Sequence, residues 1–293
     1  MKDQSKESDK RNKAMLKLKK AILIIIDLVK KTLNLEKLNQ KELKGFNTSL
    51  TKLRLLSNTK VLVPFSLGRT VRGVSFDKNV MLDPAGRLCS EISKGLNNEL
   101  LCANLAKTFN KEKSYAASDI VHLASNNILK SYPAWSIVMP WENLNIEDMF
   151  DNYPDIFFKN RRSRGLIFEN NDRLSIIKVM YSSKFIENRV SQMKELFDSI
   201  NSKGLIKDSN LPKINILKKQ HEWRWFMGDG GNHRSYILSC LGHEFFSARV
   251  SNIIDKDNIK NWHNVKNGTY SKNEAEFIFD SYFEGSKVFR GMV

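Results

Sequence analysis

The chain has 293 residues, of which 41% are hydrophobic, and its formal net charge is +16. This is enough apolar material for a sizeable core, in one large domain or two small ones. The basic balance favours anionic partners: nucleic acid, nucleotides, phosphorylated sugars or anionic lipid. Most of the excess is lysine scattered along the chain, which a biased coding composition also produces. Nucleic-acid binding is therefore not the favoured main role.

The cysteines and the apolar runs argue against further classes of protein. The three cysteines, Cys89, Cys102 and Cys240, lie far apart and form no CxxC pair, so neither a zinc site nor a disulfide framework is expected. This pattern is typical of a reducing compartment, and Cys240 is expected to be a small buried apolar residue rather than a nucleophile. The most apolar run, residues 21–29, contains Asp27 and is about half as long as a bilayer span. We therefore expect a cytoplasmic protein.

The N-terminal half predicts a basic tail followed by helices. Residues 1–13 are typical of a disordered tail, and residues 14–130 predict a mainly helical region. Within it, apolar residues from Leu18 to Leu33 recur at spacings of three and four among lysines. That helix either packs on the rest of the protein or a second copy, or lies on an anionic membrane surface. The run Val61–Phe65 is β-like.

Residues 131–254 predict alternating helices and strands, and residues 255–293 a C-terminal helical extension. The expected elements are a strand at Ala134–Met139 between two prolines, a helix at Val190–Ile200 with Gly204 past its end, strands at Leu211–Leu217 and Trp223–Met227, a helix at Ser235–Leu241 and a strand at Phe245–Val250.

Glycines concentrate between the strand at 223–227 and the next helix. Gly228, Gly230 and Gly231 each lose more backbone entropy on folding than another residue would, which indicates a tight turn or a ligand close to bare backbone. Backbone N–H groups at a helix N-terminus attract anions, and glycines let phosphate oxygens approach them. Arg234 in the first helical turn suits bidentate pairing with a phosphate.

Three polar residues in the same turn extend this interpretation. His233 donates to an oxygen or carries a proton. Asp229 repels phosphate unless a cation intervenes, so it suggests Mg²⁺ or a base acting on a substrate hydroxyl. Alternatively, Asp229 and Asn232 cap the helix, but capping alone does not require His233 and Arg234.

Two other loops carry cations. Asn160–Gly165 contains Arg161 and Arg162 and is either a solvated turn or an anion clamp, because arginine forks match phosphate oxygens. Ser66–Gly73 is punctuated by glycine and also carries two arginines, but it lacks the spacing of a P-loop, so its signal is weak.

The elements around the glycine turn follow a characteristic order. They are the helix ending at Gly204, the strands Pro212–Leu217 and Trp223–Met227, the sequence DGGNHR at 229–234, Leu241-Gly242 and the strand Phe245–Val250. From about residue 134 to 253 the chain thereby resembles the ParB/sulfiredoxin fold, whose pattern is close to DG-x-HR, with one glycine added here. The resemblance implies an α+β fold with a small mixed sheet, preceded by the mainly helical region.

Members of this fold use the turn to hold nucleotide phosphates. Sulfiredoxins carry a catalytic cysteine where this chain has Asn232, which argues against that chemistry. ParB proteins carry a following helix-turn-helix domain, for which residues 251–293 are expected to be too few. Small-molecule kinases of the fold use the Asp of the motif, here Asp229, with an upstream P-x-E glutamate. Pro140-Trp141-Glu142 is similar to that element.

The whole chain also resembles a group of bacterial proteins encoded among surface-polysaccharide genes. That resemblance rests on Tyr132–Trp135, Pro140–Glu142, Asn160-Arg161, Gly231–Arg234 and the segment Asn261–Val265, continuing to Phe279. His263 in this segment is expected to be structural rather than a ligand.

Together, the two resemblances imply an enzyme that binds a nucleoside triphosphate, ATP or CTP, with Mg²⁺ and transfers phosphate to a small-molecule or sugar hydroxyl. The alternatives are a non-catalytic nucleotide- or nucleic-acid-binding module of the ParB type, or a ParB-like nuclease. The expected catalytic residues are Asp229, His233 and Glu142, the expected phosphate-binding residues are Gly230, Gly231, Asn232, Arg234, Ser235, Arg161 and Arg162, and the expected metal ligand is Asp229. The oligomeric state stays open.

Overall fold

A computed structural model describes residues 60–76, 80–110, 115–162, 176, 179, 182–204, 211–228 and 231–285, with the backbone alone at 60, 81 and 160–162. All of them belong to one compact unit, Ser57–Val293. The expected basic tail and amphipathic helix lie outside these residues. Within the described part of the chain, no helix combines the length and apolar character that crossing a membrane requires.

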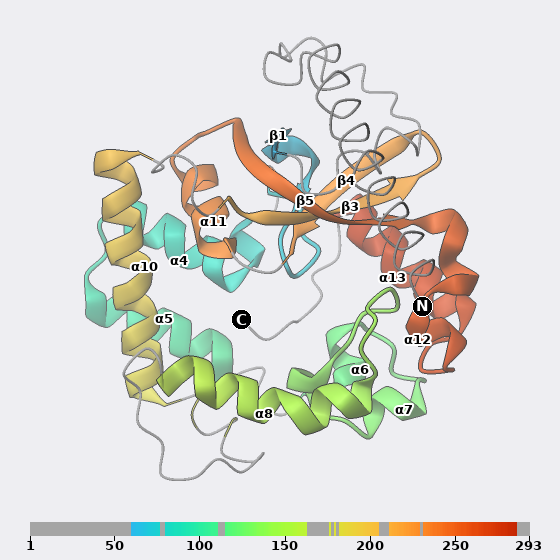
Figure 1. The fold of residues 1–293 in the computed structure, drawn as a ribbon. Coiled ribbons are helices and arrows are strands. Elements are labelled where there is room, and N and C mark those ends of the chain that lie inside the picture. The colour runs from blue at the N-terminus through green and yellow to red at the C-terminus, as the bar shows by residue number, and fades with distance from the viewer. Residues whose placement is uncertain are drawn as a thin grey trace, which may run out of the picture. The chain divides into compact units, whose positions relative to one another are not determined.

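The described elements alternate between helices and short strands (Figure 1). In chain order they are β1 Lys60–Pro64, η2 Phe65–Leu67, β2 Gly68–Arg69, η3 Val80–Leu82, α4 Pro84–Ser93, α5 Asn98–Asn110, α6 Ala117–Ile120, α7 Asn127–Lys130, η4 Ala134–Ser136, α8 Ile146–Arg162, α10 Ser183–Lys203, β3 Lys213–Lys219, β4 Glu222–Met227, α11 Asn232–Cys240, β5 Phe245–Asp255, η5 Lys256–Asn261, α12 His263–Lys266 and α13 Lys272–Glu284.

The strands form one mixed sheet in the order β1-β5-β3-β4-β2. β3 and β4 form an antiparallel hairpin, β5 runs parallel to β3, and β1 closes one edge antiparallel to β5. At the other edge β2 pairs parallel to β4. The connection from β4 to β5 passes through the glycine turn and α11. The expected α+β class is confirmed at this level, as is the order of helix, two strands, turn, helix and strand.

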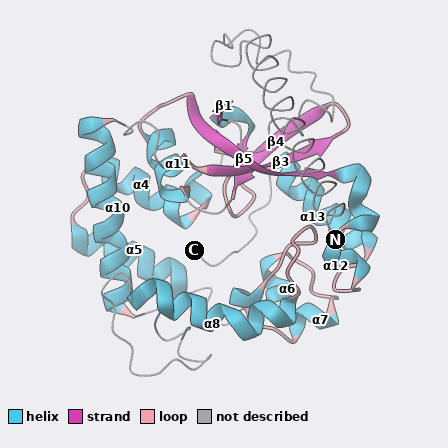
Figure 2. Ribbon diagram, viewed as in Figure 1, coloured by secondary structure: helices cyan, strands magenta, loops and turns pink. Residues whose placement is uncertain are grey.

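Both faces of the sheet are buried, as Figure 2 shows by the helices on either side of the magenta strands. The adjacent residues Trp225 and Phe226 of β4 point to opposite faces, as successive strand residues must. Trp225 is fully buried, and its indole packs on Phe65, Phe76 and Phe246. On this face α11 packs on α4, and α10 packs on both helices. Elements at the two ends of the described chain therefore share one core.

The other face of the sheet packs on the C-terminal helices. Phe226 contacts Trp141 and Tyr282, with 6.0 and 5.8 Å between ring centroids. The cluster around them comprises Ala117, Ile120, Val121, Leu123, Leu129, Ala134, Val138, Trp141, Ile146, Leu217, Phe226, Ile254, Ile259, Trp262, Tyr270, Ala275, Ile278, Phe279, Tyr282 and Phe283. Because α13 supplies five of these residues, the helix at residues 272–284 forms part of the core.

Capping residues set the helix boundaries. Asp83 caps α4 by accepting the backbone N–H of Ala85 at 2.9 Å, and proline follows it at the first helical position. Ser271 and Glu274 form a capping box on α13, which ends at Gly285 with a φ of 68°. The expected end of α10 at Gly204 is confirmed, with a φ of 70°.

The strand predicted at Ala134–Met139 is wrong. Its first half is the 3₁₀ helix η4, and its second half is extended but joins no sheet. Side chains occupy the carbonyls that a strand partner would use: Tyr270 Oη donates to Val138 O, and Asn264 Nδ2 donates to Met139 O at 3.0 Å. The flanking prolines lack N–H donors, so this segment is a poor ladder partner.

The region before residue 130 contributes strands to the sheet as well as helices. The run at Val61–Phe65 is confirmed as a strand, β1, and it pairs with β5, so it belongs to the same sheet as the later strands. β2 likewise pairs with β4. Short strands such as these are stable only when a distant partner accepts their backbone hydrogen bonds.

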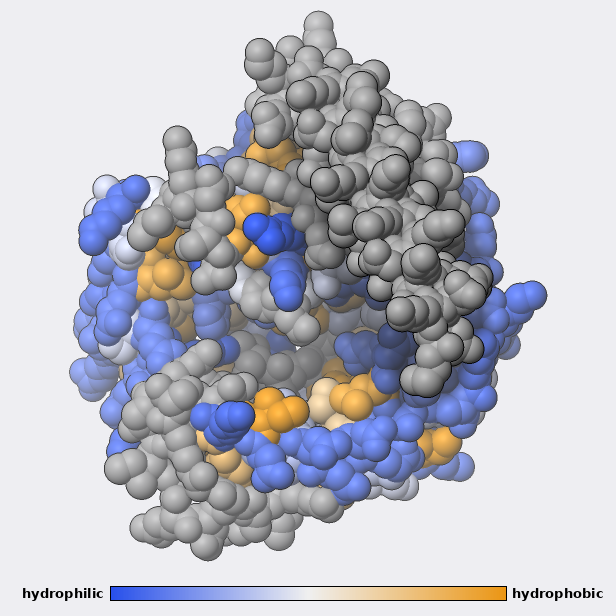
Figure 3. Space-filling model, viewed as in Figure 1, coloured by the Kyte–Doolittle hydropathy of each residue, from blue (hydrophilic) through white to orange (hydrophobic). Residues whose placement is uncertain are grey.

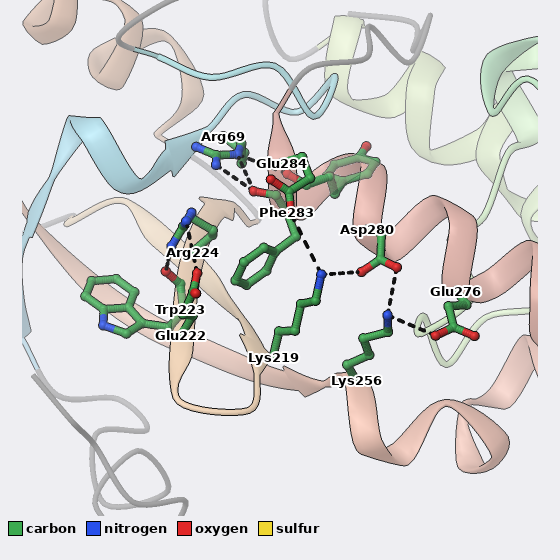
Figure 4. A network of polar contacts seen from close by, with 11 residues as sticks. Arg69, Lys219, Glu222, Trp223, Arg224, Lys256, Glu276, Asp280, Phe283 and Glu284 are labelled. Carbon is green, nitrogen blue, oxygen red and sulfur yellow. Dashed lines mark hydrogen bonds and ion pairs between the residues drawn. The ribbon is translucent and has the colours of Figure 1, made fainter.

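Ion pairs attach the β3–β4 hairpin to α13 (Figure 4). Lys219 Nζ lies 3.1 Å from Asp280 Oδ1 and 3.7 Å from Glu284 Oε1, and Lys256 lies between Asp280 and Glu276. These pairs are partly exposed, so each contributes little stability on its own. In the view of Figure 3, hydrophilic residues cover most of the described surface and hydrophobic residues form small patches.

Candidate functional site

The best-formed candidate site is the start of α11. β4 ends at Met227, and Gly228 N donates to Lys213 O at 2.8 Å, which keeps the chain on the sheet for one more residue. Gly231 is the N-cap of α11 with a φ of 89°, a left-handed conformation that favours glycine. A Cβ there would lie 2.6 Å from Pro212 Cβ. Only glycine fits this backbone and this space.

A glycine N-cap has no side chain to accept the first N–H groups of the helix, and α11 has no side-chain cap bond. The leading N–H groups of any α-helix lack an acceptor within the helix. Asn232, His233 and Arg234 form the first turn, and all three are half-buried. The Asn232 Oδ1 atom is buried and accepts no hydrogen bond from any residue that the structure describes. Ser235 lies deeper, fully buried, with its Oγ 3.4 Å from Gly231 O.

Two of the expected site residues, Asp229 and Gly230, lie outside the described residues. The assignment of Asp229 as base or metal ligand therefore stays a prediction. Among the residues that the structure does describe, no group of three or more His, Cys, Asp or Glu side chains gathers as a metal site.

Glu142 is held beside the strand that leads into the turn. Its neighbour Trp141 packs on Phe226, two residues before Gly228. Glu142 Oε2 accepts the Met139 N–H at 2.8 Å, which closes a short turn. The fully buried Asn264 shares its amide hydrogens among three carbonyls of this segment, including Glu142 O at 3.0 Å. The Pro140-Trp141-Glu142 element is thus anchored against β4, and the Glu142 side chain remains exposed.

A buried polar group lies under α11, and the sequence analysis did not identify it. Tyr236 Oη donates to Asp83 Oδ2 at 2.8 Å, while the other carboxylate oxygen caps α4. The buried residues Arg72 and Thr70 lie beside this pair. Burial, and then the charge of Asp83, raise the pKa of Tyr236 well above its ordinary value. The local signal for Asp83 is its place before Pro84, a pattern typical of a helix N-cap.

Tyr282 connects this group to Glu142. Its Oη donates to Val71 O at 2.8 Å. Burial raises the pKa of Tyr282, and the negative charges of Glu142 and Asp83 raise it further. Both carboxylates therefore act on the same phenol, one from the segment before α8 and one from the start of α4.

The other expected cations lie on other elements. Arg161 and Arg162 are the last two residues of α8, where the structure describes the backbone alone, so their assignment as phosphate-binding residues stays a prediction. In the loop Ser66–Gly73, Arg69 is buried against the end of α13 and donates to the carbonyls of Tyr282 and Phe283. The contacts of Arg69 in this loop therefore fit a structural role at the end of α13.

His263 begins α12, where its Nε2 lies 2.6 Å from Asn145 Oδ1. This contact, together with those of Asn264 and Asn267, ties α12 to the segment that carries Glu142. The geometry agrees with a structural role for His263.

The buried tyrosines predict an alkaline transition. Burial raises the pKa of Tyr236, Tyr270 and Tyr282 above the ordinary 10.0. Above about pH 10 the folded state keeps phenol protons that the unfolded state releases. The contribution of these tyrosines to the free energy of unfolding is therefore full below about pH 10, and it falls as the pH rises toward their pKa values in the folded state. In a titration of the seven tyrosines, phenolate absorbance should rise in two stages, the second together with loss of the circular dichroism signal. Titration of all tyrosines in one stage, with the fold intact, would contradict this.

No family model, no curated protein and no solved structure matches this chain. The structure defines a mixed α+β protein. Its sheet is covered on both faces, and the turn between β4 and α11 ends at the glycine N-cap of α11.

Proposed function

We propose that the β4–α11 turn binds the phosphates of a nucleoside triphosphate. The observation that carries the proposal is Gly231, a left-handed N-cap without a side chain at the start of a nine-residue helix. The bare backbone lets a phosphate oxygen approach the leading N–H groups, and the helix dipole favours its charge. Arg234 in the first turn supplies a cation with fork geometry. The Asn232 Oδ1 atom supplies a buried acceptor for a donor on the nucleotide.

The ParB/sulfiredoxin likeness belongs to the same proposal. It is supported by the order α10, β3, β4, turn, α11, β5, and by the anchored Pro140-Trp141-Glu142 element beside β4. The proposed reaction is phosphate transfer to a hydroxyl of a small molecule or sugar, in a surface-polysaccharide context. We place such a protein in the cytoplasm, where nucleoside triphosphates are available.

The chain's own residues take distinct roles in this proposal. Glu142 or Asp229 accepts the proton of the substrate hydroxyl, and His233 orients or protonates an oxygen at the turn. Arg234 stabilises charge on the transferring group. Mg²⁺, held by Asp229, would neutralise phosphate charge when bound. These roles use a carboxylate from the segment before α8, which only the packing of Trp141 on Phe226 brings to β4.

Calorimetry with ATP, CTP, GTP and UTP, each with and without Mg²⁺, tests the proposal. We expect binding of at least one nucleotide, strengthened by Mg²⁺. Changing Arg234→Ala should weaken it about 10- to 100-fold, because a charged hydrogen bond contributes about 1.5–3 kcal/mol. Lys107→Ala removes an equal charge from the exposed face of α5 and should leave the affinity unchanged.

The opposite outcomes separate the alternatives. Absence of binding by every nucleotide would remove the proposal. DNA or RNA binding that weakens steeply with salt, with no nucleotide binding, would favour the nucleic-acid-binding module. Metal-dependent nicking of a plasmid that survives Asp229→Ala would indicate a nuclease with a different site. Phosphate release or transfer that Glu142→Gln abolishes, with nucleotide binding intact, would support Glu142 as the base.

A further inference from the structure

Three sulfur-containing side chains meet where α4, α10 and α11 pack together. Cys89 Sγ on α4 lies 3.7 Å from Met193 Sδ on α10. Cys240 Sγ, at the last residue of α11, lies 3.9 Å from Gly86 O, one turn before Cys89 on the same helix. Residues three apart on a helix share a face, so the Cys240 sulfur lies beside Cys89. Both thiols are free, and each is the largest influence on the pKa of the other.

The two thiols differ in exposure and in proton affinity. Cys89 is fully buried, whereas Cys240 is partly exposed. The hydrogen bond from Cys89 lowers the pKa of Cys240, against the effect of burial. The same hydrogen bond, followed by burial, raises the pKa of Cys89. Cys240 is therefore the more exposed thiol and the one with the lower pKa, and Cys89 is the buried partner behind it. This arrangement matches an attacking and a resolving thiol.

We propose that Cys240 and Cys89 form a reversible thiol–disulfide pair that a hydroperoxide oxidises. The Cys240 thiolate attacks the O–O bond, forming an S–O bond and, with one proton, releasing water or an alcohol. Cys89 sulfur then attacks Cys240 Sγ, the S–S bond forms, and the hydroxide that leaves takes the Cys89 proton as water. Two thiols lose two electrons and the peroxide gains them. A dithiol reductant reverses the step by thiol–disulfide exchange.

The proposal gives Cys240 a role beyond that of a small apolar residue. A bond between Cys89 and Cys240 would join the end of α11 to α4. α11 begins at the glycine turn, so the redox state would act on the helix that carries the candidate site. The proposal itself does not depend on nucleotide binding, because it rests on the positions, the exposure and the relative pKa values of the two thiols.

Oxidation of the full-length protein with a small excess of hydrogen peroxide tests the pair. We expect the loss of two of the three free thiols, the mass decrease of one disulfide, and a cross-linked peptide containing Cys89 and Cys240 in a non-reducing digest. Dithiothreitol should restore all the thiols. Cys102→Ser is the matched control: Cys102 lies on α5 and not on either helix of the pair, and its variant should behave like the wild type.

Single variants of the pair identify the role of each sulfur. Cys240→Ser should leave Cys89 reduced, because the buried thiol does not react first. Cys89→Ala should leave a sulfenic acid on Cys240 that a dimedone probe captures. Circular dichroism verifies that the variants are folded, and Cys89→Ser serves as a second variant at the buried position. Retention of both thiols in the wild type, a cross-link that contains Cys102, or over-oxidation of Cys240 without a disulfide would overturn the proposal.

Discussion

Replacing Arg69 by alanine should lower the free energy of unfolding by about 3 kcal/mol, because a charged hydrogen bond contributes about 1.5–3 kcal/mol and its loss leaves buried acceptors unpaired. Arg69 is 4% exposed, and its guanidinium donates to Phe283 O at 2.6 Å, to Tyr282 O at 3.0 Å and to Gly68 O at 2.9 Å. Two of these carbonyls end α13, where the helix dipole is negative. The side chain therefore joins strand β2 to the last turn of α13 (Figure 4).

Equilibrium unfolding in guanidinium chloride measures this loss. The matched control is Arg224→Ala, which removes a second guanidinium near the same helix end. Arg224 lies 4.6 Å from the Phe283 ring centroid, and its side chain is 22% exposed. Exposed cation–π contacts contribute about 0.5–1 kcal/mol, so the control should lose less than about 1 kcal/mol. Equal losses of unfolding free energy in the two variants would show that the hydrogen bonds of Arg69 to the end of α13 do not stabilise the protein.

Replacing Gly231 by alanine should also destabilise the protein by about 3 kcal/mol, since a left-handed conformation costs a non-glycine residue about 1–2 kcal/mol and overpacking adds about 1–3 kcal/mol. The overpacking arises because the added Cβ would lie 2.6 Å from Pro212 Cβ and 2.7 Å from Pro212 Cα. Relief of this clash must move the N-cap of α11 away from β3. The proposed phosphate site should lose nucleotide affinity by the same movement.

Gly242→Ala is the matched control at the other end of α11. Gly242 also has a positive φ, of 80°, but a Cβ there would meet nothing within 4 Å. We expect only the conformational cost, about 1 kcal/mol, and unchanged nucleotide binding. Thermal unfolding gives the stabilities, and calorimetry at a temperature where both variants are folded gives the affinities. Similar losses at both glycines would mean that the contact with Pro212 is unimportant. Full nucleotide affinity in Gly231→Ala would place the phosphates elsewhere.

Local patterns along the chain were sufficient for most secondary structure around the turn. The apolar face of α10 and its end at Gly204 follow from helical spacing and a glycine cap. β1, β3, β4 and β5 follow from short apolar or alternating runs, and α11 follows from the glycine turn before it. Each of these signals depends on residues within a few positions, so it is visible without a fold. The strand predicted at Ala134–Met139 is wrong because side chains distant in sequence donate to its carbonyls in place of a neighbouring strand. Local patterns do not reveal such donors.

The sequence by itself determined the mixed α+β character, the β4–turn–α11 unit and the concentration of polar groups around the glycine turn. Only the tertiary structure decided that Gly231 is the N-cap of α11, that β1 and β2 complete the same sheet, that Arg69 binds the end of α13, and that Asp83 accepts a hydrogen bond from the Tyr236 hydroxyl. It also decided that Cys240 packs on the helix that carries Cys89, and that Trp141, next to Glu142, packs on β4. The physical reason is that backbone ladders, buried ion contacts and aromatic packing join residues far apart in the chain, and no local pattern specifies such partners.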